Sequence, residues 1–176
     1  MVQVRARWVL PALLLLLPAG VEAQQSIIIV RHAERQTGEG DDGLSDAGRQ
    51  RAERLASILK DAGVTHVFAS DRRRTLETAG PLARARNLSA STVAIPAQGR
   101  GRLDPSELQV RATLLAISKL PRTAVVLVVG HSNTVPMFLT RLGYRPAITI
   151  PDGEFDNLFV VTPRATQAPA VVRLRF

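Results

Sequence analysis

Residues 27–35 read Ile27-Ile28-Ile29-Val30-Arg31-His32-Ala33-Glu34-Arg35. Four β-branched residues in succession are typical of a short strand that is buried on both faces. Ionisable side chains follow at once, and a hydrophobic core would not accept them without partners. Open α/β sheets bind ligands at the carboxyl ends of parallel strands, so the pattern indicates either a functional site or a charged strand end in solvent.

Two later segments repeat this order of strand, polar residues and helix. Residues 64–69 lead into Ser70-Asp71-Arg72-Arg73-Arg74, and residues 123–129 lead into Gly130-His131-Ser132. The alternation predicts an α/β fold with a parallel sheet. We expect further strands at 91–95, 159–162 and 171–175, and helices at 45–62, 75–86, 105–117 and 135–142.

Three adjacent arginines stand at the start of the helix predicted to end near Arg86. This end of a helix carries partial positive charge, so cations gather there at a cost unless they hold an anion. We expect Arg72 and Arg73 to point to solvent and Arg74 to face the strand ends.

The ends of parallel strands meet at one edge of a sheet, which would bring together Arg31, His32, Arg74 and His131. Arginine binds phosphoryl oxygens with two parallel hydrogen bonds. A neutral imidazole nitrogen can attack phosphorus, and a second histidine, if protonated, would stabilise the transferring group. No carboxylate cluster suited to two metal ions follows these strands, which favours a mechanism without metal or cofactor.

The first 23 residues are typical of a signal peptide. Arg5 and Arg7 precede the short apolar run 8–17, and Val21-Glu22-Ala23 fits a cleavage site before Gln24. An uncleaved anchor is the alternative. We therefore expect an exported protein, periplasmic or extracellular, with one domain over residues 24–176. The absence of cysteine excludes thiol nucleophiles and disulfides.

The 176-residue chain carries a formal net charge of +8, and loss of Arg5, Arg7 and Glu22 with the leader leaves +7. Such a charge suits an anionic small molecule, and it allows weak association with an anionic membrane surface. The chain has one tryptophan, which lies in the leader, and one tyrosine. Because base-stacking side chains are so few, we expect no nucleic-acid partner.

Four motifs together resemble the histidine phosphatase superfamily, which includes cofactor-dependent phosphoglycerate mutases. They are Arg31-His32-Ala33-Glu34, Leu44-Ser45-x-x-Gly48-x-x-x-Ala52, Ser70-x-x-x-Arg74-x-x-x-Thr78-Ala79 and Gly130-His131-Ser132. The resemblance runs from Ile27 to about Val161. It implies a three-layer α/β/α sandwich with a mostly parallel central sheet and a small phosphorylated substrate.

The same resemblance assigns roles to individual residues. His32 would be the nucleophile, and Arg31, Arg74 and His131 would form the phosphate pocket, to which Ser132 is added. The proton donor is open: Asp104 is the tentative candidate, although it also suits a helix N-cap. Glu107, Glu34 and solvent are the alternatives, because Ser132 stands where some members carry an acid.

We therefore expect an exported, metal-independent phosphomonoesterase that forms a phosphohistidine on His32. The alternatives are a phosphate-binding or other anion-binding protein without catalysis, and a phosphohistidine phosphatase. A mutase is disfavoured because the chain lacks the long insertion that shapes the mutase pocket. Ala33 in place of the family's commoner glycine is a mild departure.

Overall fold

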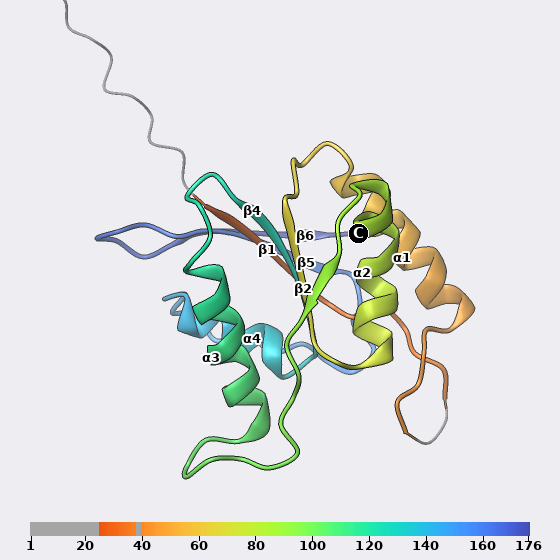
Figure 1. Ribbon diagram of the computed structural model, residues 1–176, viewed down its shortest axis with the longest axis horizontal. Helices are drawn as coiled ribbons and strands as arrows, with labels where there is room; N and C mark the ends of the chain where they lie inside the picture. The colour runs from red at the N-terminus through yellow and green to blue at the C-terminus, as the bar shows by residue number, and fades with distance from the viewer. Residues whose placement is uncertain (1–24, 38–39) are drawn as a thin grey trace, which may run out of the picture.

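A mixed sheet forms the centre of the computed structural model, which describes residues 25–37 and 40–176 (Figure 1). In chain order the elements are β1 (Ser26–Arg31), α1 (Asp46–Leu59), β2 (His66–Ala69), α2 (Arg73–Ala85), β3 (Ala90–Thr92), α3 (Pro105–Ile117), β4 (Val125–Gly130), α4 (Thr134–Arg141), β5 (Asn157–Thr162) and β6 (Ala170–Arg175).

The sheet has the strand order β3-β2-β4-β1-β5-β6. Strands β3, β2, β4 and β1 run parallel to one another, whereas β5 runs antiparallel to β1 and β6 antiparallel to β5. The mostly parallel central sheet predicted from the sequence is therefore confirmed. Because β1 and β4 are paired on both sides, their carboxyl ends are held in fixed register.

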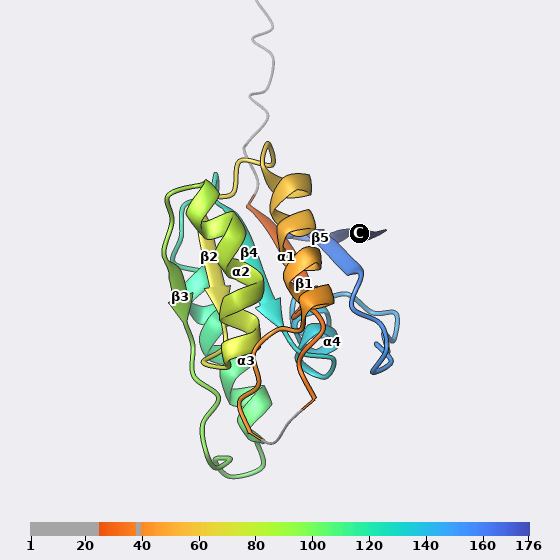
Figure 2. The ribbon, with the colours of Figure 1, turned by 90° about the vertical axis from the view of Figure 1, so that its right-hand side faces the viewer.

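Helices cover both faces of the sheet, with α1 and α2 on one side and α3 and α4 on the other (Figures 1 and 2). Alternate residues of β1 enter the two cores: Ile28 and Val30 pack with Leu55 of α1, while Ile27 and Ile29 pack with Phe138 of α4. This explains why the strand is apolar throughout, since neither face meets water. The three-layer sandwich is confirmed.

Helix α1 is fixed against the segment that leaves β1. The Gly48 N–H donates to Ser45 Oγ, so Ser45 caps the helix as its sequence predicts. A Cβ atom at Gly48 would lie 2.0 Å from the Glu34 carbonyl oxygen, and the Ser45 N–H donates to that same oxygen at 2.9 Å. Glycine thus lets the first turn of α1 touch the backbone just after His32.

The third strand is shorter than the predicted 91–95, because β3 spans Ala90–Thr92. The Val93 N–H still donates to the Ala69 carbonyl, but the Ile95 N–H donates to the Asp71 carboxylate instead of a strand. The chain therefore leaves the sheet at Ile95 and turns toward the carboxyl end of β2.

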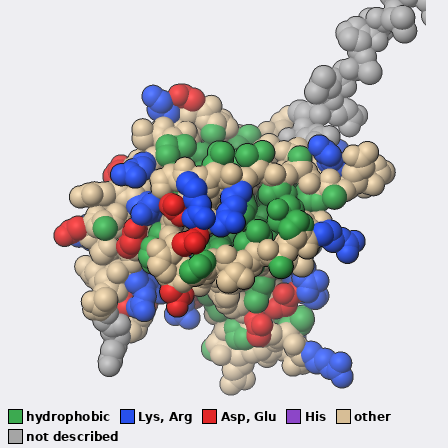
Figure 3. Space-filling model, turned by 180° about the vertical axis from the view of Figure 1, so that it is seen from behind, with side chains coloured by type: hydrophobic (Ala, Val, Ile, Leu, Met, Phe, Trp, Pro, Cys, Tyr) green, Lys and Arg blue, Asp and Glu red, His purple; other side chains and the backbone are tan. Residues whose placement is uncertain are grey.

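The edge strand β6 is exposed and carries Arg173 and Arg175, which pair with Glu154. Seen from behind, the surface shows basic and acidic side chains beside a hydrophobic area (Figure 3). Charges on an edge strand disfavour pairing with another chain. The predicted leader, residues 1–23, lies outside the described residues, and no helix among residues 25–37 and 40–176 has the length and hydrophobicity to cross a membrane.

Candidate active site

The carboxyl ends of β1, β2 and β4 bring together His32, Ser70 and His131. Arg31 lies opposite Gly130 in the parallel register, and the His32 N–H donates to the Gly130 carbonyl at 2.9 Å. The two imidazole rings are consequently neighbours, with centroids 5.3 Å apart. Both are buried, at 5% and 7% exposure.

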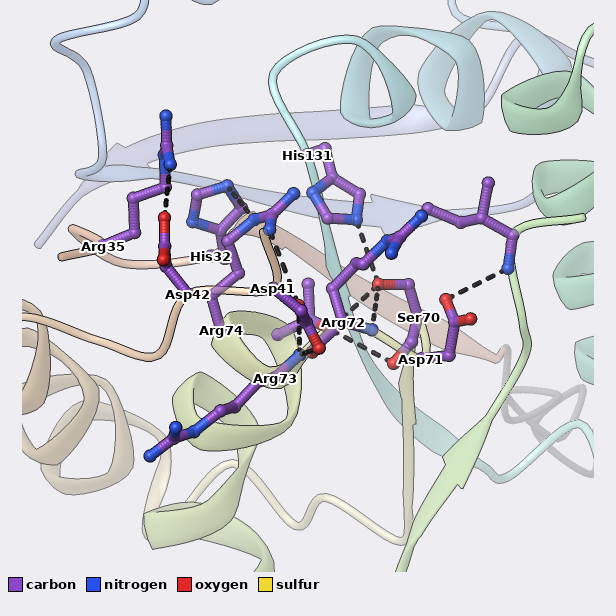
Figure 4. Close-up of polar contacts among 12 residues, drawn as sticks. His32, Arg35, Asp41, Asp42, Ser70, Asp71, Arg72, Arg73, Arg74 and His131 are labelled. Atoms are coloured by element: carbon purple, nitrogen blue, oxygen red, sulfur yellow. Dashed lines mark hydrogen bonds and ion pairs between the residues drawn. The ribbon is translucent and has the colours of Figure 1, made fainter. Parts of the chain in front are cut away.

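Hydrogen bonding fixes the tautomer of His32. Its Nδ1 lies 2.8 Å from the Ala33 carbonyl oxygen, which can only accept, so the proton is on Nδ1. Nε2 then presents its lone pair and accepts from Arg74 Nε–H at 3.2 Å (Figure 4). Burial, together with the charges of Arg74 and Arg31, lowers the pKa of His32 to about 4. The ring is therefore neutral at pH 7 and can act as a nucleophile.

His131 is held by a network of hydroxyl groups. Its Nε2 lies 2.9 Å from Ser70 Oγ, and Ser70 Oγ also contacts Thr75 Oγ1 at 2.9 Å (Figure 4). Burial, then the charges of His32, Arg74 and Arg72, lower the pKa of His131 to about 3. From the sequence we considered a protonated second histidine, but the buried ring is neutral at pH 7 and forms its hydrogen bond as a neutral imidazole.

Arg31 reaches a segment of the chain that the sequence did not connect with the site. One nitrogen, Nη1, donates to the carbonyls of Pro151, Asp152 and Glu154 at 2.8, 2.9 and 3.0 Å. Its Cζ lies 4.2 Å from the centroid of the Phe155 ring. Arg31 therefore holds residues 151–155 at the edge of the site, and the same side chain also faces the site.

Arg74 lies between the two histidines and an acidic loop. Its Nη1 is 3.8 Å from Asp41, and Asp41 also accepts from the Arg73 N–H at 3.0 Å (Figure 4). Burial lowers the pKa of Arg74, although not enough to remove its charge at neutral pH. Asp41 thus caps α2, which has no cap from its own Arg72 side chain.

Two cavities share His32 and Arg74. The larger, of about 470 Å³, is also lined by Arg31, Arg35, Gly40, Asp152 and Phe155. The smaller, of about 290 Å³, is also lined by Arg72, Ile95, Ser106, His131, Ser132 and Asn133. The structure therefore gathers all the predicted phosphate-binding residues around these two cavities.

The position of Arg72 differs from our prediction. We expected its side chain to point to solvent, but it is half-buried and lines the smaller cavity. The extended backbone of Arg72, just before α2, turns its side chain toward His131, whereas Arg73 points away (Figure 4). Arg73 is exposed and pairs with Glu77, as expected for a solvent-facing residue.

The structure does not bring Asp104 to the site. Its carboxylate accepts from the Glu107 N–H at 2.8 Å and so caps α3, and Asp104 lines neither cavity. The alternative acids are also engaged elsewhere, Glu107 with Arg111 and Glu34 with Arg51. Of the carboxylates in the described part of the chain, Asp152 lines a cavity with His32. No pattern in the sequence pointed to it, because no motif surrounds Asp152.

Part of the chain is similar in sequence to known proteins. Residues 27–95 match the family model described as histidine phosphatase superfamily (branch 1). A 61-residue segment is 46% identical to phosphoglycerate mutase-like protein 4 of Arabidopsis thaliana and covers 30% of this chain and 26% of that relative. The matched segments span about a quarter to a third of the curated relatives' length.

Solved structures share the fold along most of the chain. A candidate α-ribazole-5'-P phosphatase from Escherichia coli has a TM-score of 0.68 at 17% identity, over 87% of this chain and 97% of that one. A candidate phosphohistidine phosphatase, SixA from Agrobacterium tumefaciens, has a TM-score of 0.60 at 21% identity, over 86% and 98%. Residues 27–95 are therefore similar in sequence to the histidine phosphatase superfamily, and most of the chain shares the fold of these solved structures.

Proposed function

We propose that the protein is a phosphomonoesterase that works through a phosphohistidine on His32. The observation that carries the proposal is the unprotonated Nε2 of His32, buried beside His131 and 3.2 Å from the Nε of Arg74. A neutral nitrogen next to a cation is the arrangement needed for this reaction, because the nitrogen attacks the phosphoryl group while the cation neutralises the negative charge of the phosphoryl oxygens. The family match of residues 27–95 and the phosphatases among the structural neighbours support the same proposal.

The first step transfers the phosphoryl group to the protein. Nε2 attacks phosphorus, the ester P–O bond breaks, and the leaving oxygen takes a proton from water. Arg74 and Arg31 bind the equatorial oxygens, and His131, held by Ser70, adds a hydrogen bond. The Nδ1–H group donates a hydrogen bond to the Ala33 carbonyl throughout. The positive charge that develops on the imidazole ring is therefore partly dispersed to the backbone.

The second step returns the histidine to its starting form. Water attacks phosphorus, the P–N bond breaks, and Nε2 recovers its lone pair. We assign the proton released by water to Asp152, the carboxylate that shares the larger cavity with His32. The backbone carbonyl of Asp152 accepts from Arg31, so the residue is tied to the phosphate pocket.

The proposal also includes metal independence and export. No three His, Asp or Glu side chains gather as a metal site within the described residues, and the chemistry above needs only the chain's own groups. Export rests on the apolar run and on Val21-Glu22-Ala23.

Steady-state kinetics on p-nitrophenyl phosphate test the function. His32→Ala should lower turnover by at least ~10⁴-fold, since it removes the covalent route. Arg74→Ala and His131→Ala should each lower it by about 10²–10³-fold, the scale for one transition-state partner. His66→Ala is the control, because His66 lies at the opposite end of β2 and bonds Thr65.

The competing function is anion binding without catalysis. In that case the purified protein would bind inorganic phosphate but would not hydrolyse p-nitrophenyl phosphate, with or without added divalent metal. Hydrolysis that a chelator abolishes would contradict the metal-free mechanism and leave the phosphatase assignment standing.

A further inference from the structure

A further cavity, which we call the distal cavity, lies at the end of the sheet opposite the two histidines (Figure 1). Three segments form it: the residue before β1, the connection from α3 to β4, and the connection from β5 to β6. It has a volume of about 270 Å³ and is lined by Gln25, Ser118, Leu120, Arg122, Pro163, Arg164 and Ala165. Strands β1 and β4 have six residues each, so a length of roughly 20 Å separates this cavity from the active site.

Hydrogen bonds fix the walls of the distal cavity. The side-chain N–H of Gln25 donates to the Ile117 carbonyl at 3.1 Å, which ties the chain before β1 to the end of α3. The Ala124 N–H donates to the Pro121 carbonyl at 2.9 Å and closes the turn that presents Arg122. The fold therefore determines where this arginine stands.

Two cations of the distal cavity have no acidic partner. Arg122 and Arg164 are exposed, and none of the ion pairs in the described part of the chain involves either of them. No described Asp or Glu lines the cavity. The end of α3 carries about half a negative charge, which leaves most of the two positive charges uncompensated. The cavity therefore attracts an anion.

Apolar side chains lie beside these cations. Leu120 and Pro163 line the cavity, and Leu115 is 60% exposed on the last turn of α3, which ends there. A soluble anion such as inorganic phosphate would use the arginines and leave the apolar groups in water. Basic side chains next to exposed apolar ones fit the surface of an anionic lipid bilayer, which offers both phosphate groups and hydrocarbon.

The position of the distal cavity along the chain favours the same partner. Gln25 follows the predicted leader, residues 1–23, after one intervening residue. This end of the sheet is therefore the one nearest to a membrane that the leader enters. A bilayer at this end leaves the opposite end, with His32 and His131, directed away from the lipid and open to substrate in solution.

From these observations we infer that the distal cavity docks the protein on an anionic phospholipid bilayer. Arg122 and Arg164 bind lipid phosphates, and Leu115 and Leu120 contact the boundary of the hydrocarbon region. The net positive charge of the chain attracts it to such a surface, and the distal cavity determines which face turns toward it. This docking does not depend on the chemistry at His32.

Vesicle binding by protein purified from the extracytoplasmic fraction tests the inference. In about 0.1 M salt we expect co-sedimentation with phosphatidylcholine vesicles that contain about 30% phosphatidylglycerol, and much less with phosphatidylcholine alone. Arg122→Gln combined with Arg164→Gln should weaken binding to the anionic vesicles by about 10-fold or more, since a basic side chain at such a surface contributes about 5-fold.

Arg100→Gln combined with Arg102→Gln is the matched control. It removes the same charge from the loop between β3 and α3, which lies far from the distal cavity in both ribbon views (Figures 1 and 2). Binding should weaken by less than about 3-fold, because salt screens charges that are held away from the surface. Neither pair lines the cavities of the active site, so both double variants should keep hydrolysis of p-nitrophenyl phosphate.

The possible results separate this inference from its alternatives. Equal weakening in the two double variants contradicts it, because net charge alone would then drive binding. Failure to bind the anionic vesicles, or equal binding to both kinds of vesicle, also contradicts it. Calorimetric titration with glycerophosphoglycerol, the headgroup without acyl chains, should show no saturable binding, and tight binding that requires Arg122 and Arg164 would overturn the membrane assignment. A protein that docks as expected but does not hydrolyse p-nitrophenyl phosphate overturns the proposed function and supports this inference.

Discussion

At the scale of single residues, the sequence was most informative where strand ends force side chains together. His32 and His131 follow neighbouring parallel strands in register, so their proximity could be predicted from two short motifs. The contacts of Arg31 with residues 151–155 could not, because they join segments about 120 positions apart through tertiary packing. Asp152 was missed for the same reason, and Arg72 was misplaced because three consecutive arginines give no sign of which one faces inward.

The lowered pKa of His32 gives a prediction at this scale. An ordinary histidine titrates near pH 6.5, whereas His32 should remain neutral down to about pH 4. The proton that switches off the nucleophile therefore binds only in acid. The histidines of the unfolded chain take up protons at higher pH than the buried rings of His32 and His131. The free energy of unfolding should therefore decrease as the pH falls below 6.5.

Imidazole NMR signals measured as a function of pH test this prediction. The signals of His32 and His131 should show no titration between pH 8 and 5, and His66 serves as an internal comparison from outside the site. A midpoint for His32 near 6.5 would contradict the geometry, because it would require a ring open to water rather than one with 5% exposure.

At the scale of elements, periodicity and capping signals identified the helices well. Ser45 and Asp104 both cap the helices that follow them, as predicted. The strands were harder to delimit, since β3 ends early where Ile95 bonds Asp71. The same part of the chain shows why Asp104 does not reach the site. The segment after β3 brings Ile95 and Ser106 to the smaller cavity, whereas Asp104 remains at the cap of α3.

Asp104→Asn tests the capping role. Asparagine caps a helix about as well as aspartate but cannot act as an acid. We expect unchanged melting and unchanged rates on both p-nitrophenyl phosphate and an alkyl phosphate, measured side by side. Asp104→Ala should instead lower the free energy of unfolding by about 1 kcal/mol with the rates retained. A selective loss on the alkyl phosphate in Asp104→Asn would restore Asp104 as the proton donor.

At the scale of the whole molecule, the fold follows from one pattern repeated along the chain. Apolar strands of the kind seen in β1 and β4 need cover on both faces, and the amphipathic helices between them supply it. The order of the strands in the sheet and the two antiparallel strands at one edge come from the structure alone, because periodicity does not tell which strands pair.

Export is a prediction about the whole chain. The short apolar run and the motif before Gln24 predict that the chain found outside the cytoplasm begins at Gln24. Intact-mass measurement of protein from the extracytoplasmic fraction checks this. Loss of residues 1–23 is expected, whereas the full-length mass in a membrane fraction would indicate an uncleaved anchor.

We propose above all that His32 carries the phosphoryl group during turnover. Asp152→Asn should slow hydrolysis of the intermediate and so increase its amount. Quenching that variant in alkali during turnover, followed by peptide mass mapping, locates the phosphoryl group directly. We expect one added phosphoryl group on the peptide that contains His32, and none when His32→Ala is combined with Asp152→Asn. A phosphoryl group on His131 or elsewhere, or full turnover by His32→Ala, would contradict it.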